Sequence, residues 1–160
     1  MIRVTPAGPG DVPALAELLD EMGRFYGTAS ALPAQERVRQ ISDALFTSPV
    51  AAHALLAWDG ARLAGMAVYS FLWPAAGLTR SLYMKELYVG ERHRRRGVGK
   101  LLMQALFETA GQHGCSRIEW TTDSDNAGAQ AFYEMLGLPL HPAKVFYRVE
   151  GASGRFRWRA

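Results

Sequence analysis

The chain begins with apolar residues that alternate with polar ones and continues with apolar residues at helical spacing. Ile2 and Val4 alternate with polar neighbours, which predicts a strand over residues 1–7 that ends at a Gly-Pro-Gly turn. A helix is expected next, because a buried stripe follows at intervals of three and four residues, formed by Leu15, Leu18, Leu19 and Met22. A comparable stripe predicts a second helix over residues 33–46, which ends before Pro49.

The period changes from helical to alternating after residue 52. Two apolar runs at 53–58 and 62–73 are joined by Asp59-Gly60, a strong hairpin turn. A third apolar run at 80–89 follows a segment that contains Pro and Gly. The pattern therefore predicts a meander of three antiparallel strands.

The last third of the chain returns to alternating helices and strands. A helix is predicted from Val98 to Gly114, a strand at 117–122, a helix at 126–136 and a closing strand at 144–149. This order predicts one α/β domain over residues 1–150 with a mixed, mainly antiparallel sheet. A parallel pair is expected where the long helix crosses between two strands.

Composition supports a globular protein with a proper core. Of the 160 residues, 49% are hydrophobic and 21% charged, which argues against large-scale disorder. Cys115 is the only cysteine, so neither an internal disulfide nor a cysteine-based zinc site can form. The four histidines lack metal-ligand spacing, so no metal is expected. Without an apolar leader or a membrane-length apolar run, we expect a cytoplasmic protein and no membrane association.

Much of the positive charge lies in two short stretches. The net charge is +3, and the basic residues concentrate at 92–100 and in the tail 151–160, which contains Arg-Phe-Arg-Trp-Arg. The tail alternates charged and aromatic residues with period two. If its aromatics are buried, it forms an edge strand or a homodimer contact; a frayed terminus is the alternative.

The other basic stretch lies between a predicted strand and a predicted helix. Gly97 and Gly99 fall on the first helical turn, where free backbone N–H groups attract anions. Basic side chains surround this turn, namely Arg94, Arg95, Arg96 and Lys100. The loop therefore predicts a phosphate site. Leu101 and Leu102 exclude the Walker loop and the dinucleotide fingerprint, and nucleic-acid binding remains an alternative that a five-charge loop supports poorly.

Two segments carry a resemblance to a known family. Arg94-Arg95-Arg96-Gly97-Val98-Gly99 is similar to the Arg/Gln-x-x-Gly-x-Gly/Ala signature of the GNAT superfamily of N-acetyltransferases. The segment from Asn126 through Ala129, Phe132 and Tyr133 to Gly137 resembles that family's Asn-x-x-Ala-x-x-Phe-Tyr-x-x-x-Gly-Phe motif, with Leu138 in place of the final aromatic. The order of strands and helices is also similar over nearly the whole chain.

The resemblance implies acetyl-CoA as cosubstrate and about four helices around a sheet with a splayed parallel pair. It implies that residues 94–100 bind the pyrophosphate, including Val98 and Lys100. A bulge in the preceding strand would open a gap in which backbone groups of Leu87, Tyr88 and Val89 bind the pantetheine arm. The resemblance also implies that Asn126, Ala129 and Tyr133 flank that arm. The spacing agrees with this, because Asn126, Ala129 or Gln130, and Tyr133 can share one helix face.

A weaker resemblance concerns the acceptor. Residues 65–99 are similar to the corresponding region of spermidine/spermine and thialysine acetyltransferases, which implies a small primary amine such as a polyamine or a lysine analogue. Lys85 departs from that pattern, because those enzymes tend to carry an acidic residue there. Acetylation of a protein N-terminus or lysine is an alternative, as is a non-catalytic module that binds acyl-CoA or nucleic acid.

Two residues are candidates for the chemistry. A primary amine with a pKa of ~10 is mostly protonated at neutral pH, so its attack on a thioester needs a proton acceptor, for which Glu86 is the candidate. Tyr133 is the candidate donor to the departing thiolate, since a phenol keeps its proton at pH 7. With no activated nucleophile evident, direct transfer to the amine is expected.

Overall fold

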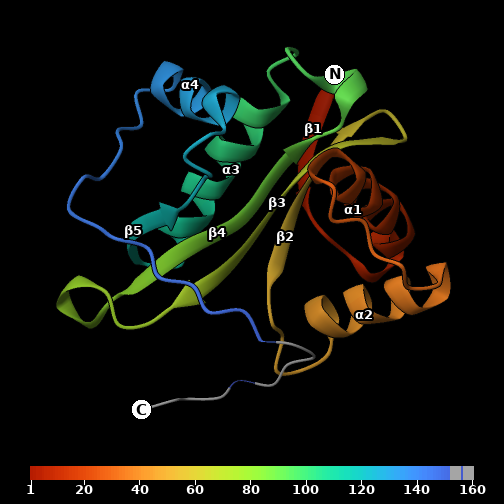
Figure 1. The fold of residues 1–160 in the computed structure, drawn as a ribbon, viewed down its shortest axis with the longest axis horizontal. Coiled ribbons are helices and arrows are strands. Elements are labelled where there is room, and N and C mark those ends of the chain that lie inside the picture. The colour runs from red at the N-terminus through yellow and green to blue at the C-terminus, as the bar shows by residue number, and fades with distance from the viewer. Residues whose placement is uncertain (152–155, 157–160) are drawn as a thin grey trace. The chain divides into compact units, whose positions relative to one another are not determined.

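Five strands form one sheet in which the spatial order follows the chain order. The strands are β1 (Ile2–Pro6), β2 (His53–Asp59), β3 (Arg62–Leu72), β4 (Arg80–Val89) and β5 (Cys115–Trp120). Neighbouring strands from β1 to β4 are antiparallel, while β4 and β5 are parallel (Figure 1). The prediction of a mixed, mainly antiparallel sheet is confirmed.

This computed structural model describes residues 1–151 and 156. The chain divides into two units, Met1–Thr121 and Thr122–Ala160. The first unit contains the sheet and three α-helices, α1 (Val12–Tyr26), α2 (Ala34–Phe46) and α3 (Val98–Gln112). In the described part of the second unit there is one α-helix, α4 (Ala127–Met135). Within the described residues, no helix combines the length and apolarity needed to cross a membrane.

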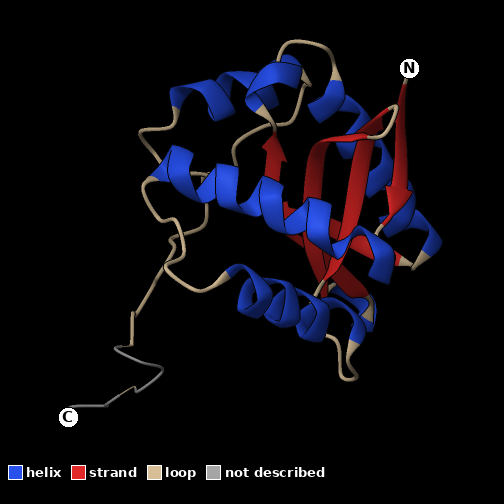
Figure 2. Cartoon of the chain, turned by 90° about the vertical axis from the view of Figure 1, so that its right-hand side faces the viewer, coloured by secondary structure: helices blue, strands red, loops and turns tan. Residues whose placement is uncertain are grey.

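Helices α1 and α2 lie on one face of the sheet. Leu15 and Leu18 of α1 pack against Leu56, Met66 and Tyr88 of the central strands, and all five side chains are at most 5% exposed. Figure 2 looks at the sheet from the side of these two helices. The helical stripe read from the sequence is therefore the one that packs on the sheet.

Helix α3 covers the opposite face, and a glycine allows its close approach. Gly65 precedes Met66 on β3, so it faces the other side of the sheet. A Cβ atom there would lie 2.9 Å from the carbonyl oxygen of Tyr88 and 3.1–3.2 Å from side-chain atoms of Val98 and Leu102. The first turns of α3 thus contact the sheet where β3 has no side chain.

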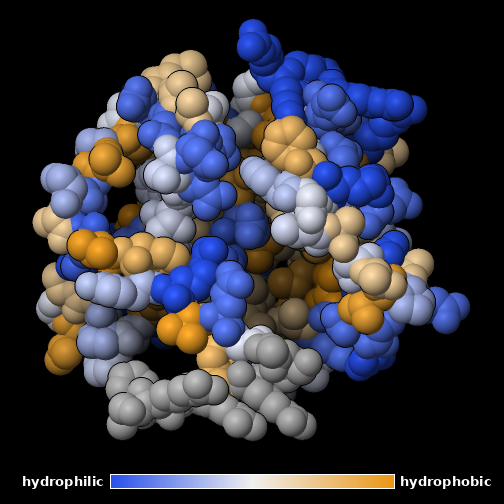
Figure 3. Space-filling view, viewed as in Figure 1, coloured by the Kyte–Doolittle hydropathy of each residue, from blue (hydrophilic) through white to orange (hydrophobic). Residues whose placement is uncertain are grey.

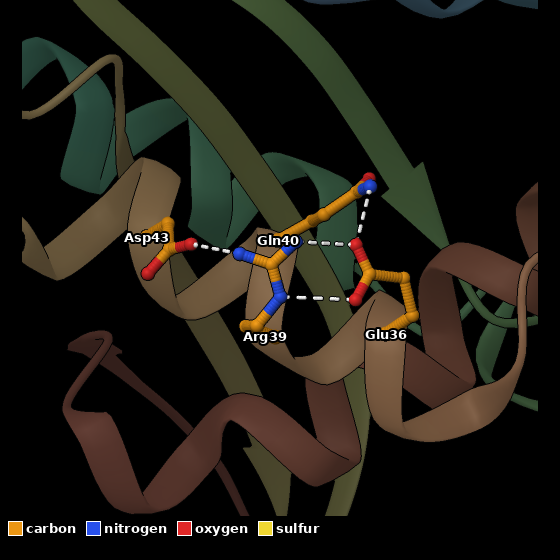
Figure 4. A network of polar contacts seen from close by, with 4 residues as sticks. All are labelled: Glu36, Arg39, Gln40 and Asp43. Atoms are coloured by element: carbon orange, nitrogen blue, oxygen red, sulfur yellow. Dashed lines mark hydrogen bonds and ion pairs between the residues drawn. The ribbon is translucent and has the colours of Figure 1, made fainter.

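Helix α2 carries a polar network on its exposed surface (Figure 4). Arg39 donates to Glu36 through Nε at 2.9 Å and to Asp43 through Nη1 at 3.0 Å, and Gln40 donates to Glu36 at 3.0 Å. The Arg39 hydrogen bond lowers the pKa of the Glu36 carboxyl, with a smaller contribution from Gln40. These contacts link side chains three and four residues apart and favour the helical conformation of α2.

The predicted closing strand at residues 144–149 is wrong, because the structure has no strand there. Val145, Phe146, Tyr147 and Val149 are 60–87% exposed. Their β-propensity is local, whereas a strand exists only when a neighbour completes its hydrogen bonds. The tail, for which an edge strand, a homodimer contact or a frayed terminus was expected, falls outside the described residues, apart from Gly151 and Phe156.

Candidate functional site

Strand β4 pairs with β3 along nearly its whole length but with β5 only along its first half. Pairing with β5 covers residues 80–84 and stops where β5 ends at Trp120. Pairing with β3 continues to Val89. Across this ladder Glu86 lies opposite Val68 and Met84 opposite Tyr69, so Lys85 is the extra residue of a β-bulge. The bulge and the parted strand pair that the resemblance implied are both present.

The parting leaves one side of β4 without a β5 neighbour. In a parallel ladder, alternate peptide groups of a strand point toward each neighbour. At residues 85–89, those that point away from β3 are not paired with β5. Such groups can bind an extended, amide-containing ligand in the way a further strand would.

A short loop leads from this half of β4 into α3. It contains a 3-10 turn at Glu91–His93 and two residues with left-handed backbone, Arg95 at φ 59° and Gly97 at φ 77°. Gly97 is the N-cap of α3, and its carbonyl oxygen accepts the N–H of Leu101 at 3.1 Å. The N–H groups of the three residues before Leu101 therefore belong to the open first turn of the helix, which attracts anions.

The side chains around this turn are strongly basic. Arg95, Arg96 and Lys100 are exposed, Gly99 is half-buried and Val98 is buried. Figure 3 shows deep blue, hydrophilic residues at the end of the molecule where Figure 1 shows this loop. Arg96 forms an ion pair with Asp59 of the β2–β3 turn at 2.9 Å. The open first turn of α3 and these basic side chains therefore lie together in one loop.

Arg94 differs from the other arginines because its side chain lies against the protein. Its Nε donates to the carbonyl oxygen of Val89 at 3.2 Å, and its Nη2 lies 3.4 Å from the hydroxyl of Tyr88. The guanidinium also lies 4.4 Å from the ring centre of Phe25 on α1. Arg94 therefore connects the loop, the end of β4 and α1.

Glu21 on α1 completes this arrangement, and no sequence motif singled it out. Its Oε1 accepts the hydroxyl of Tyr88 at 3.1 Å and the backbone N–H of Glu91 at 2.9 Å. Burial raises the pKa of the Tyr88 phenol and the Glu21 carboxylate raises it further, while Arg94 lowers it. The available signal was weak: Glu21 follows Leu18 by three residues and so borders the apolar stripe.

The structure determines which face of the sheet carries Glu86. Glu86 lies opposite Val68, and Val68 packs against the core beneath α1. Cross-strand partners share a face, so Glu86 is on the side of α1 and α2 and is half-buried. Glu119 of β5 lies on this face too, because it pairs with Tyr83, which the bulge at Lys85 brings onto the same face as Glu86.

The second motif forms helix α4 in the second unit. Asn126 is its N-cap, and its Oδ1 accepts the N–H of Ala129 at 3.1 Å. Gly137, at φ 72°, follows the end of the helix. Tyr133 is half-buried, with its ring 5.2 Å from that of Phe132. The asparagine and the glycine of the motif thus begin and end the helix that carries Tyr133.

His113 and Cys115 lie at the end of α3 and at the start of β5. Burial raises the pKa of the half-buried Cys115 thiol, an effect that Arg80 partly opposes. The Nδ1 of His113 lies 2.9 Å from the carbonyl oxygen of Thr109, and its ring lies tilted against that of Phe71, with 4.6 Å between the ring centres. Across residues 1–151 and 156, no three His, Cys, Asp or Glu side chains gather as a metal site.

The fold and this site define a class of mixed-sheet proteins with a parted parallel strand pair beside an anion-binding helix N-terminus. A model of the acetyltransferase (GNAT) family matches residues 15–138, and the chain belongs to that family. An integron cassette protein from the mobile metagenome of V. cholerae has a similar solved structure, with a TM-score of 0.85 and 29% identity over 94% of this chain and 93% of that one.

Two curated relatives are N-acetyltransferases. An L-ornithine N5-acetyltransferase of Arabidopsis thaliana is 32% identical over 56% of this chain and 39% of its own length. A thialysine N-epsilon-acetyltransferase of Caenorhabditis elegans is 28% identical over 64% of this chain and 66% of its own length. The chain therefore spans less than two thirds of either relative.

Proposed function

We propose that this chain is an acetyl-CoA-dependent N-acetyltransferase that transfers the acetyl group directly to a primary amine of a small molecule. The observation that carries the proposal is the parted half of β4, which leads directly into the basic loop and the N-terminus of α3. A strand edge for the pantetheine amides and an anion site for the pyrophosphate are thus adjacent along the chain.

The residues present suit the two ends of acetyl-CoA. The first turn of α3, with Gly97 and Gly99, would bind the pyrophosphate through backbone N–H groups, while Arg95, Arg96 and Lys100 add exposed charge. Backbone groups at residues 87–89 would bind the pantetheine arm as an added strand does. A backbone N–H in this half of β4 would polarise the thioester carbonyl.

The chemistry requires one bond to form and one to break. The amine nitrogen attacks the thioester carbon, a C–N bond forms and the C–S bond breaks. The proton lost by the amine passes to Glu86, directly or through water, and the departing thiolate receives a proton from Tyr133. Glu86 suits this role because its half-buried carboxylate lies at the bulge where β4 leaves β5.

The acceptor class is proposed from the relatives. Their names record acetylation of ornithine and of thialysine, and both are small amino acids with a side-chain amine. Ornithine, lysine analogues and polyamines are therefore the first compounds to test.

The decisive experiment measures CoA thiol release from acetyl-CoA in the presence of an amine panel. The panel contains ornithine, lysine analogues, polyamines, aminoglycosides and N-terminal or lysine peptides. Acetylation of a small amine, with the product identified by mass, supports the proposal. Transfer to peptides alone would replace it with protein acetylation, and tight CoA binding without any transfer would indicate a non-catalytic module.

A further inference from the structure

We propose that Glu21 of α1 is a positioning residue that holds the phosphate-binding loop in its ligand-ready geometry. This inference rests on the proposed function only in taking the loop as the CoA site. Glu21 does not touch the ligand in this proposal; it acts through Tyr88, Glu91 and Arg94.

The first step of the argument is the pair of hydrogen bonds to one carboxylate oxygen. Glu21 Oε1 accepts the Tyr88 hydroxyl at 3.1 Å and the Glu91 N–H at 2.9 Å. Tyr88 belongs to the parted half of β4, and Glu91 opens the 3-10 turn of the loop. One side chain of α1 therefore holds the junction between β4 and the loop on both sides of Gly90.

The second step is the packing of α1 against Gly90. A Cβ at Gly90 would lie 3.5 Å from Leu18 Cδ1 and 3.7 Å from Glu21 Oε1, and its N–H donates to the carbonyl oxygen of Ala64 at 2.9 Å. Helix α1 thus lies directly against the backbone of the junction. A change at Glu21 is transmitted to the loop without an intervening flexible segment.

The third step is the position of Arg94. Its guanidinium lies between Phe25 of α1, at 4.4 Å, and Tyr88, at 5.6 Å from the ring centres. Glu21 places the Tyr88 hydroxyl within 3.4 Å of Arg94 Nη2. Without the Glu21 carboxylate, the Tyr88 hydroxyl loses its acceptor. Arg94 then loses the fixed position of this neighbour, and the start of the loop segment 95–97 is held less firmly.

The test compares three substitutions on one helix. Glu21→Ala removes both hydrogen bonds, whereas Glu21→Gln keeps an oxygen that can accept them. Glu17→Ala, one turn earlier at an exposed position, controls for the loss of a carboxylate from α1. Calorimetric titration with CoA, the KM for acetyl-CoA, kcat and the melting temperature are measured for each variant.

We expect Glu21→Ala to weaken CoA binding about tenfold or more and to raise the KM for acetyl-CoA similarly, with kcat at saturation retained. Glu21→Gln should recover most of the affinity, and Glu17→Ala should equal the wild type. Tyr88→Phe removes only a hydroxyl and should weaken CoA binding in the same direction, which keeps the test valid if Glu21→Ala does not fold.

The inference is overturned if folded Glu21→Ala and Tyr88→Phe bind CoA as tightly as the wild type. It is also overturned if Glu21→Gln is no better than Glu21→Ala, because the acceptor geometry would then be irrelevant. Failure of the proposed function looks different: the wild type would acetylate no amine, while its CoA affinity would still report on Glu21.

Discussion

The two halves of β4 have the same neighbour on one side and different surroundings on the other. Residues 80–84 lie between β3 and β5, with Leu82 and Met84 at most 3% exposed. Residues 85–89 keep β3 but not β5, and they begin at the exposed Lys85 of the bulge. A single extra residue thus separates a half that stabilises the sheet from a half whose backbone can serve a ligand.

The contrast teaches that backbone pairing, and not side-chain identity, distinguishes the two halves. Both halves contain apolar as well as polar residues. Substitutions in the paired half should therefore lower stability and leave chemistry intact. Substitutions in the parted half, or in the loop that continues it, should lower CoA affinity or kcat and cost less stability.

The largest effect is expected where the parted half leads into the helix. Gly99→Glu places a charged side chain on the first turn of α3 and should reduce CoA affinity beyond measurement. The loss should exceed that of Arg94→Ala, which removes the charge-assisted hydrogen bond to the Val89 carbonyl oxygen, a contact worth ~1.5–3 kcal/mol. Calorimetry measures both, with Gly111→Glu, in open space later on α3, as the control. Unchanged affinity in Gly99→Glu would remove the phosphate site from this loop.

Glu86→Gln tests whether the parted half contributes chemistry. It should lower kcat roughly 10²–10⁴-fold near neutral pH, with partial recovery at high pH, where an amine of pKa ~10 loses its proton unaided. The matched control is Glu119→Gln, a carboxylate on the same face beside the paired half, which should retain kcat. A pH–rate profile of each variant is the measurement. Equal losses of kcat in the two variants would contradict the proposed difference between the two halves of β4.

Tyr133→Phe tests the proposed proton donor from the second unit. Loss of acid catalysis should lower kcat by roughly 10²–10⁴-fold while CoA affinity stays near normal. Single-turnover kinetics under conditions where chemistry limits the rate provide the measurement. An undiminished kcat would take Tyr133 out of the mechanism and leave Asn126 and Gly137 as determinants of helix α4 alone.

Leu82→Ala tests the paired half. Leu82 is fully buried, so its truncation should lower the free energy of unfolding by about 2–5 kcal/mol. Denaturant titration gives this value, and kcat per folded molecule should be retained. Leu87→Ala, at a half-buried position of the parted half, should cost less stability. A larger loss of stability in Leu87→Ala than in Leu82→Ala would contradict the proposed difference between the two halves.

The smallest effect is expected at the hydrogen bond between β4 and β5. Ser81 Oγ donates to Glu119 Oε2 at 2.5 Å, and Ser81 is 3% exposed. Ser81→Ala should lower the free energy of unfolding by about 1 kcal/mol without changing the KM for acetyl-CoA. A change in that KM would show that the paired half also takes part in binding.

The sequence predicted the elements of the first unit because their patterns are local. The run at 80–89 was predicted as a strand, and β4 occupies those residues. The prediction of an anion site in the basic loop rests in the same way on glycines and arginines that are neighbours in the chain. For β4, the residues that carry the pattern also form the strand.

The sequence did not predict features that depend on distant partners. Glu21 meets Tyr88, 67 residues away, and Glu91, 70 residues away, and no local pattern encodes such contacts. Asp59 was recognised only as a turn residue, yet it pairs with Arg96. The face that carries Glu86 also remained open until the register with Val68 was known.

Gly65 has a consequence for mutational screening. Because α3 rests on the sheet where Gly65 has no side chain, any larger residue there displaces the helix whose first turn is the proposed phosphate site. A screen for loss of CoA binding would then recover Gly65 variants together with variants of the loop itself. The screen would score as a ligand contact a residue that acts only by leaving room for a helix.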